Sequence, residues 1–171
     1  MAEEFVFIGH DYFGENVKAK SKYRAIVKTA FDEVNNKYLL PYSRNFTPIF
    51  GDTKQSECPA LFQVLSQQDL FQPNQGYWIE IIGKISLSTF AIFDLTHNSL
   101  RLHLNANVIL EYGVALGLNK SCHVLTAQLR LVKRHLSNIA GTLVYPYNNT
   151  AALRNAIIEI CQLHATMLRK L

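Results

Sequence analysis

The 171-residue sequence lacks most of the motifs by which nucleotide-binding and hydrolytic folds are recognised. It has no GxGxxG after its first apolar run and no GxxxxGK[ST], so a Rossmann-type dinucleotide site and a P-loop triphosphatase are both disfavoured. It also has no HExxH and no GxSxG, which argues against zinc proteases and α/β-hydrolases. Any catalytic site must therefore be sought in residues outside these motifs.

Cysteine is scarce and follows no pattern. The three cysteines are Cys58, Cys122 and Cys161, and no two of them form a CxxC pair or have metal-ligand spacing. An odd number of unpaired thiols is typical of proteins from a reducing compartment, which predicts a cytoplasmic location. We therefore expect neither a disulfide framework nor a metal site.

Long apolar runs and concentrated charge are also missing. No stretch approaches the roughly 20 apolar residues that span a bilayer, and the first residues lack the basic and apolar regions of a signal peptide. The net charge is only +4, with much of the excess in the C-terminal part. Such diffuse charge predicts a solvated basic surface and is compatible with a nucleotide ligand, but it indicates no membrane and no direct nucleic-acid partner.

What the sequence does have is an alternation of strand-like and helical segments, with the 49% hydrophobic residues of a globular protein. Predicted strands cover residues 5–8, 46–50, 89–94, 121–126 and 141–145, and predicted helices cover residues 22–40, 61–65, 78–87, 107–118 and 150–171. Residues 130–138 are predicted as a short helix or a loop, and Pro48 indicates that its strand lies at a sheet edge. The alternation predicts one α/β domain, residues 1–171, with a mostly parallel sheet and helices on both faces.

The most informative segment joins the strand 89–94 to the helix 107–118. The strand is a continuous apolar run that ends in Asp94, and the helix is apolar apart from Glu111 and one tyrosine hydroxyl. Asn107 is a good N-cap residue and shares a helical face with Glu111. Because ligands of open α/β sheets bind beyond the carboxyl ends of the strands, we expect Asp94 and the first turn of this helix to lie at a binding edge.

Two interpretations of Glu111 remain open at this point. A lone buried carboxylate is costly, so it needs a reason to be there. One reason is chemistry, as a nucleophile or as the electrostatic partner of an oxocarbenium ion during cleavage of a glycosidic bond. The other is structural, with the carboxylate bonded to backbone amides or paired with a lysine.

Residues 85–120 resemble the signature of TIR-like nucleotide-binding proteins and of the related nucleoside 2-deoxyribosyltransferase-like families. Their pattern runs I-x-x-A-x-x-x-x-D-x-T and then N-P-N-V-x-x-E-L-G-x-A-x-A-x-G-K, and this chain has FDLT followed by NANVILEYGVALGLNK. Ala106 replaces the usual proline, and Tyr112 replaces the usual leucine. The resemblance implies a flavodoxin-like fold and, for many members, cleavage of an N-glycosidic bond in NAD or another nucleotide.

The resemblance also implies roles for individual residues. Glu111 matches the catalytic glutamate of the helix, and Asp94 matches the strand-end aspartate that such proteins use around the substrate. The implied substrate-binding residues are Gly9, His10, Asp11, Tyr12, Asp94, Thr96 and Asn107. Tyr12 and its neighbour Phe13 are candidates to stack on a base, or else to pack within their loop. The implied chemistry needs no metal and no cofactor besides the nucleotide itself.

Two classes of function follow. The leading hypothesis is a nucleotide N-glycosidase, most specifically an NAD hydrolase of the TIR-like kind, in which Glu111 stabilises or captures the anomeric carbon while Asp94 and Asn107 orient sugar hydroxyls. The resemblance implies prokaryotic antiviral defence as one setting for it. The alternative is a non-catalytic TIR-like module that binds a nucleotide signal or assembles into a homo-oligomer.

Overall fold

The computed structural model describes residues 2–10, 17–67, 76–96, 104–135 and 143–168. The strands in these ranges are β1 (Ala2–Gly9), β2 (Arg44–Phe50), β3 (Phe90–Asp94), β4 (Ser121–Thr126) and β5 (Leu143–Pro146). The helices are α1 (Val17–Val34), the π-helical turn η1 (Asn35–Leu39), the 3₁₀ turn η2 (Leu40–Tyr42), α2 (Pro59–Gln67), α3 (Tyr77–Leu87), α4 (Ala106–Gly117), α5 (Leu129–His135) and α6 (Thr150–Leu168).

The strands form one five-stranded sheet in the order β2-β1-β3-β4-β5, and every neighbouring pair is parallel. This is the flavodoxin-like strand order, so the predicted α/β class and its parallel sheet are confirmed. The sequence left residues 130–138 open between a short helix and a loop. The described part of that range lies in α5 (Leu129–His135), in the connection from β4 to β5. A helical connection is what two neighbouring parallel strands require.

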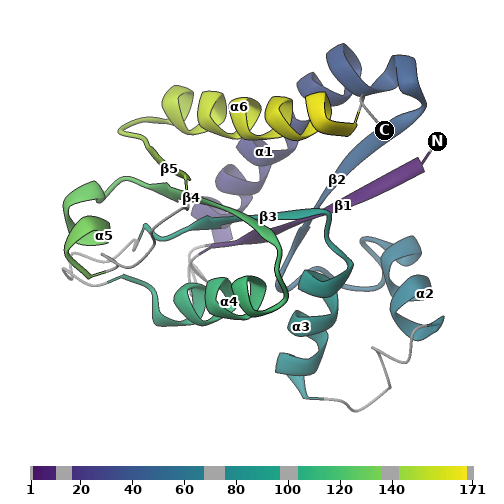
Figure 1. The fold of residues 1–171 in the computed structure, drawn as a ribbon, viewed down its shortest axis with the longest axis horizontal. Helices are drawn as coiled ribbons and strands as arrows, with labels where there is room; N and C mark the ends of the chain where they lie inside the picture. Colours follow the sequence, from purple (N-terminus) through teal and green to yellow (C-terminus); the bar gives the residue numbers. More distant parts are fainter. Residues whose placement is uncertain (1, 11–16, 68–75, 97–103, 136–142, 169–171) are drawn as a thin grey trace.

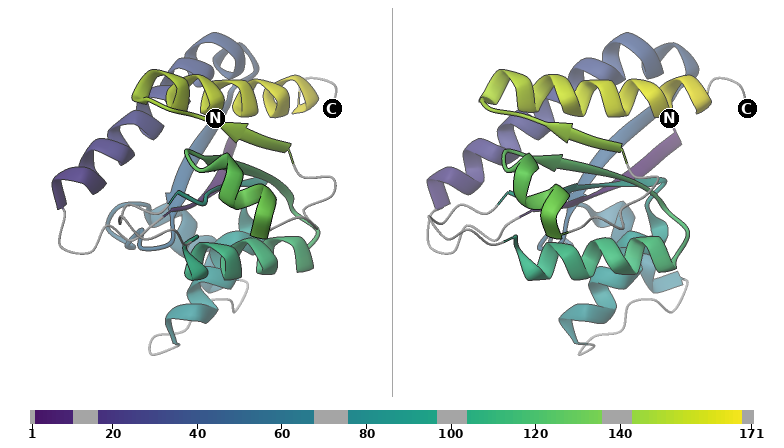
Figure 2. Two further views of the ribbon diagram at one scale, coloured as in Figure 1. Left: turned by 90° about the vertical axis from the view of Figure 1, so that its left-hand side faces the viewer. Right: turned by 60° about the vertical axis from the view of Figure 1, so that its left-hand side comes forward.

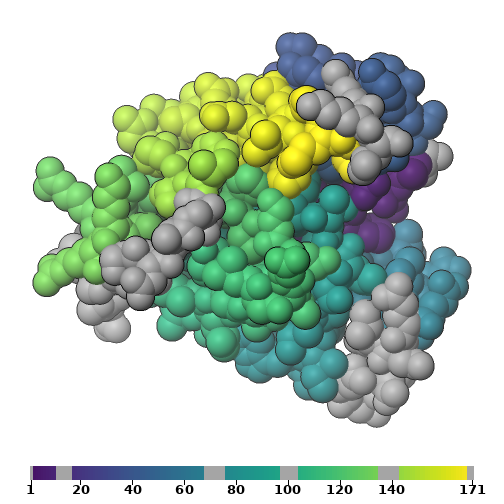
Figure 3. All heavy atoms as spheres, viewed as in Figure 1, coloured from purple at the N-terminus to yellow at the C-terminus, as the bar shows by residue number. Residues whose placement is uncertain are grey.

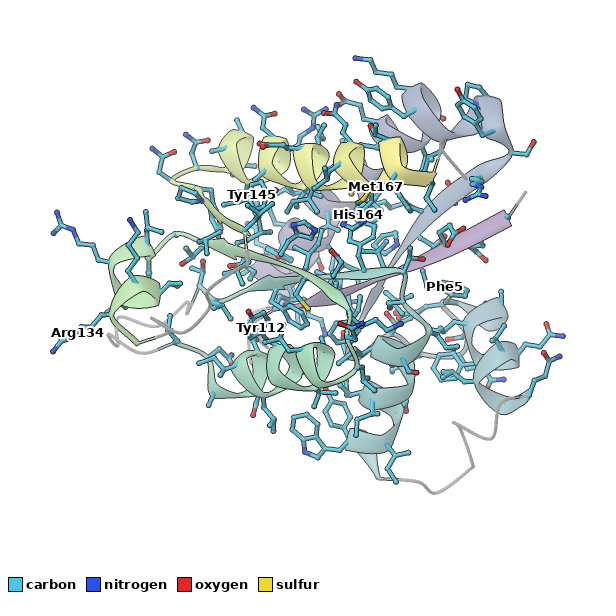
Figure 4. All side chains as sticks on the ribbon, in the orientation of Figure 1. Phe5, Tyr112, Arg134, Tyr145, His164 and Met167 are labelled. Atoms are coloured by element: carbon cyan, nitrogen blue, oxygen red, sulfur yellow. The ribbon has the colours of Figure 1, made fainter. Side chains whose placement is uncertain are left out.

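Helices cover both faces of the sheet, as the sequence predicts. Figure 1 shows α1 and α6 above the strands and α3 and α4 below them, and the rotated views keep this separation (Figure 2). Alternation along β1 explains the two cores, because Val6 and Ile8 pack toward α1 and α6 while Phe5 and Phe7 pack toward the opposite helices. Figure 4 shows the same arrangement from the helices, with Tyr112 of α4 and His164 of α6 directed at the sheet from opposite sides.

The N-cap of α4 differs from the prediction by two residues. Asn107 was the predicted cap, but Asn105 has the extended backbone of a cap, and its side-chain oxygen accepts hydrogen bonds from the amides of Asn107 (2.9 Å) and Val108 (3.2 Å). Asn107 is therefore in the first turn of the helix and is exposed. Both positions carry asparagine, a good N-cap residue, so the residue type alone could not decide between them.

Between Phe46 and Phe50, the outer edge of β2 leaves no N–H group free. The prediction that Pro48 marks an edge strand is confirmed, because β2 pairs only with β1 among the described strands. On the outward side, the Asn35 amide accepts a hydrogen bond from the Phe46 N–H (2.8 Å) and donates one to the Phe46 carbonyl (2.9 Å). Pro48 has no N–H, and the Phe50 N–H donates to the Thr53 hydroxyl (2.8 Å).

A pair of buried histidines joins α6 to the sheet. The Nε2 atoms of His123, from β4, and His164 lie 2.7 Å apart, and the His164 ring stacks on Phe90 with ring centroids 3.7 Å apart. Burial lowers the pKa of each histidine to about 4, with the neighbouring ring adding to the effect for His164. Both imidazoles are therefore neutral at physiological pH, and their stacking belongs to the apolar core.

The surface agrees with the diffuse charge of the sequence. The basic residues Arg130, Lys133 and Arg134 of α5 are exposed. In the space-filling view α5 projects from the left end of the molecule (Figure 3), and Arg134 points away from the body in Figure 4. None of the helices in the described ranges is both long and apolar enough to cross a membrane.

Candidate functional site

A cavity of about 260 Å³ lies at the carboxyl ends of β1 and β2, against the first turns of α3 and α4. Its lining residues are Ile8, His10, Gly51, Asp52, Tyr77, Trp78, Asn105, Asn107 and Glu111. In this strand order the connections change direction between β1 and β3, and that switch point is where open α/β sheets bind ligands. The cavity therefore occupies the edge at which the sequence predicts a site.

Glu111 reaches the cavity from the second turn of α4, with 8% of its surface exposed. Two glycines leave room for its carboxylate. A β-carbon at position 9 would lie 2.9 Å from Oε2 of Glu111 and 2.6 Å from Cδ1 of Phe93, and one at position 51 would lie 3.6 Å from Oε1. The carboxylate is thus placed between the ends of β1 and β2, and a side chain at Gly9 would displace it.

The Glu111 carboxylate is buried, and no described side chain compensates its charge. Among the residues that the structure describes, neither a hydrogen bond nor an ion pair holds it. Burial raises the pKa of Glu111 to about 7, and the nearby negative charge of Asp52 adds to the rise. The structural interpretation, with Glu111 bonded to backbone amides or a lysine, is therefore not what the described residues show.

Asp52 is the second carboxylate of the cavity, and its environment lowers its pKa, whereas that of Glu111 is raised. Burial alone would raise its pKa, but a hydrogen bond from Lys20 and the charges of Arg24, Lys20 and His10 hold that pKa below its usual value. Asp52 is therefore ionised at neutral pH while Glu111 is close to half protonated. Paired carboxyls whose pKa values are pushed apart are a common arrangement for acid–base and nucleophilic chemistry.

Lys84 holds the loop that carries Gly51 and Asp52. Its ammonium group is fully buried and donates to the carbonyls of Gly51 and Thr53, each at 2.8 Å, while the Glu80 carboxylate lies 2.5 Å away. A buried cation with this many partners fixes the position of the backbone that it contacts. Lys84 is thus a positioning residue for one wall of the cavity.

The predicted residues at the end of β1 lie where they were expected, as far as they are described. Gly9 is not among the lining residues but lies beside the Glu111 carboxylate, and the half-buried His10 lines the cavity. The His10 ring lies against Tyr23 and Phe50, with centroids 5.0 and 5.3 Å away. The predictions for Asp11, Tyr12 and Phe13 lie outside the described residues.

Asp94 and Thr96 belong to a different cluster. Asp94 is buried and accepts hydrogen bonds from the Thr96 amide (3.0 Å) and the Tyr147 hydroxyl (2.9 Å). Thr96 accepts a further hydrogen bond from the Ala127 amide at 2.9 Å. Neither residue lines the cavity.

The alternation of side chains along β3 explains this separation. Asp94 has the same parity as Phe90 and Ile92, which face α1 and α6, whereas Glu111 comes from α4 on the other face. The prediction that both carboxylates lie at the carboxyl edge is correct, but the sheet separates them. The structure instead brings Glu111 together with His10 and Asn107.

Six lining residues were missed from the sequence: Ile8, Gly51, Asp52, Tyr77, Trp78 and Asn105. Asp52 carried a usable signal, because it follows a predicted strand just as Asp94 does. Tyr77 and Trp78 carried a weaker one, as adjacent aromatic residues at the start of a predicted helix. No group of three or more His, Cys, Asp or Glu side chains suited to a metal ion occurs within the described residues.

Comparison with known proteins gives distant similarities. No protein-family model matches the chain. No curated protein matches it either. A solved 2-deoxyribosyltransferase from Leishmania mexicana is 13% identical with a TM-score of 0.43; the match covers 72% of this chain, which spans 65% of the length of that protein. A solved CMP N-glycosidase from Clostridium botulinum is 12% identical with a TM-score of 0.45, and the match covers 90% of this chain and 98% of the other.

Proposed function

We propose that this chain is a nucleotide N-glycosidase whose catalytic residue is Glu111. The observation that carries the proposal is the Glu111 carboxylate itself, which is buried, has no partner among the described residues and faces a cavity at the switch point of the sheet. A carboxylate in this state costs stability, and such costs are concentrated at functional sites. The cavity also carries polar groups with which to orient a sugar, among them Asn107 and His10.

The proposed reaction breaks the bond between the anomeric carbon of the sugar and the nitrogen of the base. The bonding electrons leave with the base, and ionised Glu111 stabilises the positive charge on the anomeric carbon or forms a covalent bond to it. Water then forms the new C–O bond at the anomeric carbon and displaces the Glu111 carboxylate where that is bonded. The proton released by water goes to the departed base or, for neutral nicotinamide, to solvent. Asn107 orients sugar hydroxyls in this scheme, whereas Asp94 and Thr96, which do not line the cavity, have a structural role.

Within this class, the specific reaction that we propose is NAD hydrolysis of the TIR-like kind. Nicotinamide leaves as a neutral group, so the step requires no acid on the leaving base. A neutral leaving group suits this site, because Asp52 beside Glu111 is ionised. The described cations near Asp52, Lys20 and Arg24, are both paired with it. A role in prokaryotic antiviral defence is proposed from the resemblance of residues 85–120 alone.

The test compares wild type with Glu111→Gln, which keeps the shape of the side chain and removes its charge. Each protein is incubated with NAD, NADP and a set of nucleoside and deoxynucleoside monophosphates, and the free base is measured by chromatography. We expect the variant to lose activity by at least about 100-fold, as for removal of one strong electrostatic contact in a transition state. The exposed Glu159 of α6 provides the control, because Glu159→Gln removes an equal charge far from the cavity lining.

Each outcome decides a separate point. Equal rates in wild type and Glu111→Gln would remove the catalytic assignment. Nucleotide binding by wild type without release of base would favour the non-catalytic module instead.

A further inference from the structure

One wall of the cavity consists of two aromatic residues. Tyr77 and Trp78 occupy the first turn of α3, and their ring centroids are 6.2 Å apart with the rings inclined by 71°. Both line the cavity, yet 57% of the Tyr77 surface and 38% of the Trp78 surface are exposed. Large aromatic surfaces that border a polar cavity and remain open to solvent are suited to contact with a flat apolar ligand.

This wall lies close to the proposed reacting group. The Tyr77 hydroxyl and Oε1 of Glu111 are each 3.6 Å from the position that a β-carbon of Gly51 would take, so the two oxygens are at most about 7 Å apart. Apart from Ile8, the other lining side chains are polar or charged, with Asn105 and Asn107 at the start of α4 and Asp52 after β2. Among the described lining residues, the large aromatic surface is therefore the Tyr77–Trp78 pair of α3, a short distance from the carboxylate.

The size of the cavity limits what it encloses. Its volume of about 260 Å³ is just below the roughly 300–1,000 Å³ of pockets that bury drug-sized ligands. A single nucleoside unit suits that space, whereas the second nucleoside of a dinucleotide would have to remain outside.

We infer that Tyr77 and Trp78 form the base-binding surface of this cavity, which encloses one nucleoside unit with its base on α3 and its anomeric carbon toward Glu111. The inference rests on the proposed function for the position of the sugar. Stacking of bases on aromatic side chains is tolerant of base identity, because every base presents a π-face. The site accordingly selects for the presence of a base more than for its hydrogen-bonding pattern.

The chain provides its own probe for this contact, because Trp78 is the only tryptophan. Intrinsic fluorescence of Glu111→Gln, which binds without turnover in the proposed mechanism, is titrated with AMP, CMP and nicotinamide mononucleotide, with correction for ligand absorbance. Ribose 5-phosphate serves as the probe without a base. We expect saturable quenching by the three nucleotides and no change in emission with ribose 5-phosphate.

Substitutions give the second measurement. By titration calorimetry in the same Glu111→Gln background, Trp78→Ala is expected to raise the Kd of AMP roughly 5- to 150-fold, which corresponds to about 1–3 kcal/mol of stacking. Trp78→Phe keeps a ring and is expected to restore most of the affinity. Ile79→Ala is the matched control, because Ile79 is the next residue, is 48% exposed and does not line the cavity.

Unchanged affinity in Trp78→Ala, equal quenching by ribose 5-phosphate, or no binding by any probe would each overturn the inference. The proposed function is tested separately, by measuring the release of base by wild type and by Glu111→Gln. Base-dependent quenching in a protein that releases no base would thus retain the base-binding surface and reject the enzyme.

Discussion

Replacing Glu111 by glutamine is expected to make the folded chain more stable above neutral pH. The pKa of Glu111 is raised from an ordinary 4.5 to about 7, mainly by burial. Between those two values the folded state retains a proton that the unfolded state has lost, so the free energy of unfolding falls as the pH rises through this window. Each pKa unit corresponds to 1.36 kcal/mol, so the ionised carboxylate costs about 3 kcal/mol at pH 8.5.

The amide of glutamine does not ionise, so the variant avoids this cost. We expect Glu111→Gln to exceed wild type by about 2–3 kcal/mol in free energy of unfolding at pH 8.5, the lower value allowing for the partial exposure of the side chain. At pH 4.5 both side chains are largely neutral in the folded state, and the difference should nearly disappear. If Glu111 is catalytic as proposed, its burial trades stability for reactivity.

Urea unfolding followed by circular dichroism, at pH 4.5 and at pH 8.5, measures the difference directly. Other titrating groups contribute equally to wild type and variant, so their effects cancel when the two are subtracted. Glu159→Gln, on the exposed side of α6, should show no such pH-dependent gain. A Glu111→Gln variant that is no more stable than wild type at pH 8.5, or a gain of equal size at both pH values, would refute the reasoning.

Two further predictions concern other titrating groups. For the histidine pair, the folded pKa of about 4 lies below the usual 6.5, so the unfolded chain binds protons first and stability is lost as the pH falls from about 6.5 to 4. His164→Phe should reduce this dependence of the free energy of unfolding on pH, as measured by urea unfolding. An unchanged dependence would contradict the prediction. Asp52→Asn removes the negative charge that raises the Glu111 pKa, so the rise of kcat/KM with pH, whose midpoint we expect near pH 7, should move to lower pH. A midpoint that stays in place or moves upward would show that Asp52 does not act on Glu111.

The sequence predicted the strands and helices whose composition or periodicity is distinctive. Apolar runs such as residues 90–94 are buried on both faces, so their composition alone identifies them as central strands. Pro48 identified an edge because its missing N–H cannot take part in an interior ladder. The helix-or-loop ambiguity over 130–138 arose because α5 has only one buried residue, Val132, among its described side chains, so its sequence carries little helical periodicity.

The site was predicted in part, and the limits have a physical cause. Glu111 was identifiable because a single carboxylate in an apolar helix is unusual at the level of composition. That Asp94 faces away from it depends on strand parity relative to the helix layers, which one sequence does not specify. Tyr77 and Trp78 reach the cavity because of where α3 packs against the sheet, and the sequence offered only a weak sign of it, two adjacent aromatic residues at the start of a predicted helix.

The closed outer edge of β2 has a consequence for how the chain emerges during synthesis. Asn35, Pro48 and Thr53 all lie within the first third of the sequence, together with both strands of the β1–β2 pair. A nascent segment that has formed β1, α1 and β2 therefore already blocks its outer side against strands from other molecules, and only the inner side of β1 awaits a partner. Because β3 fills that side later, the growing sheet is protected from misassembly on one flank before the ribosome has made the residues of the cavity's α4 wall.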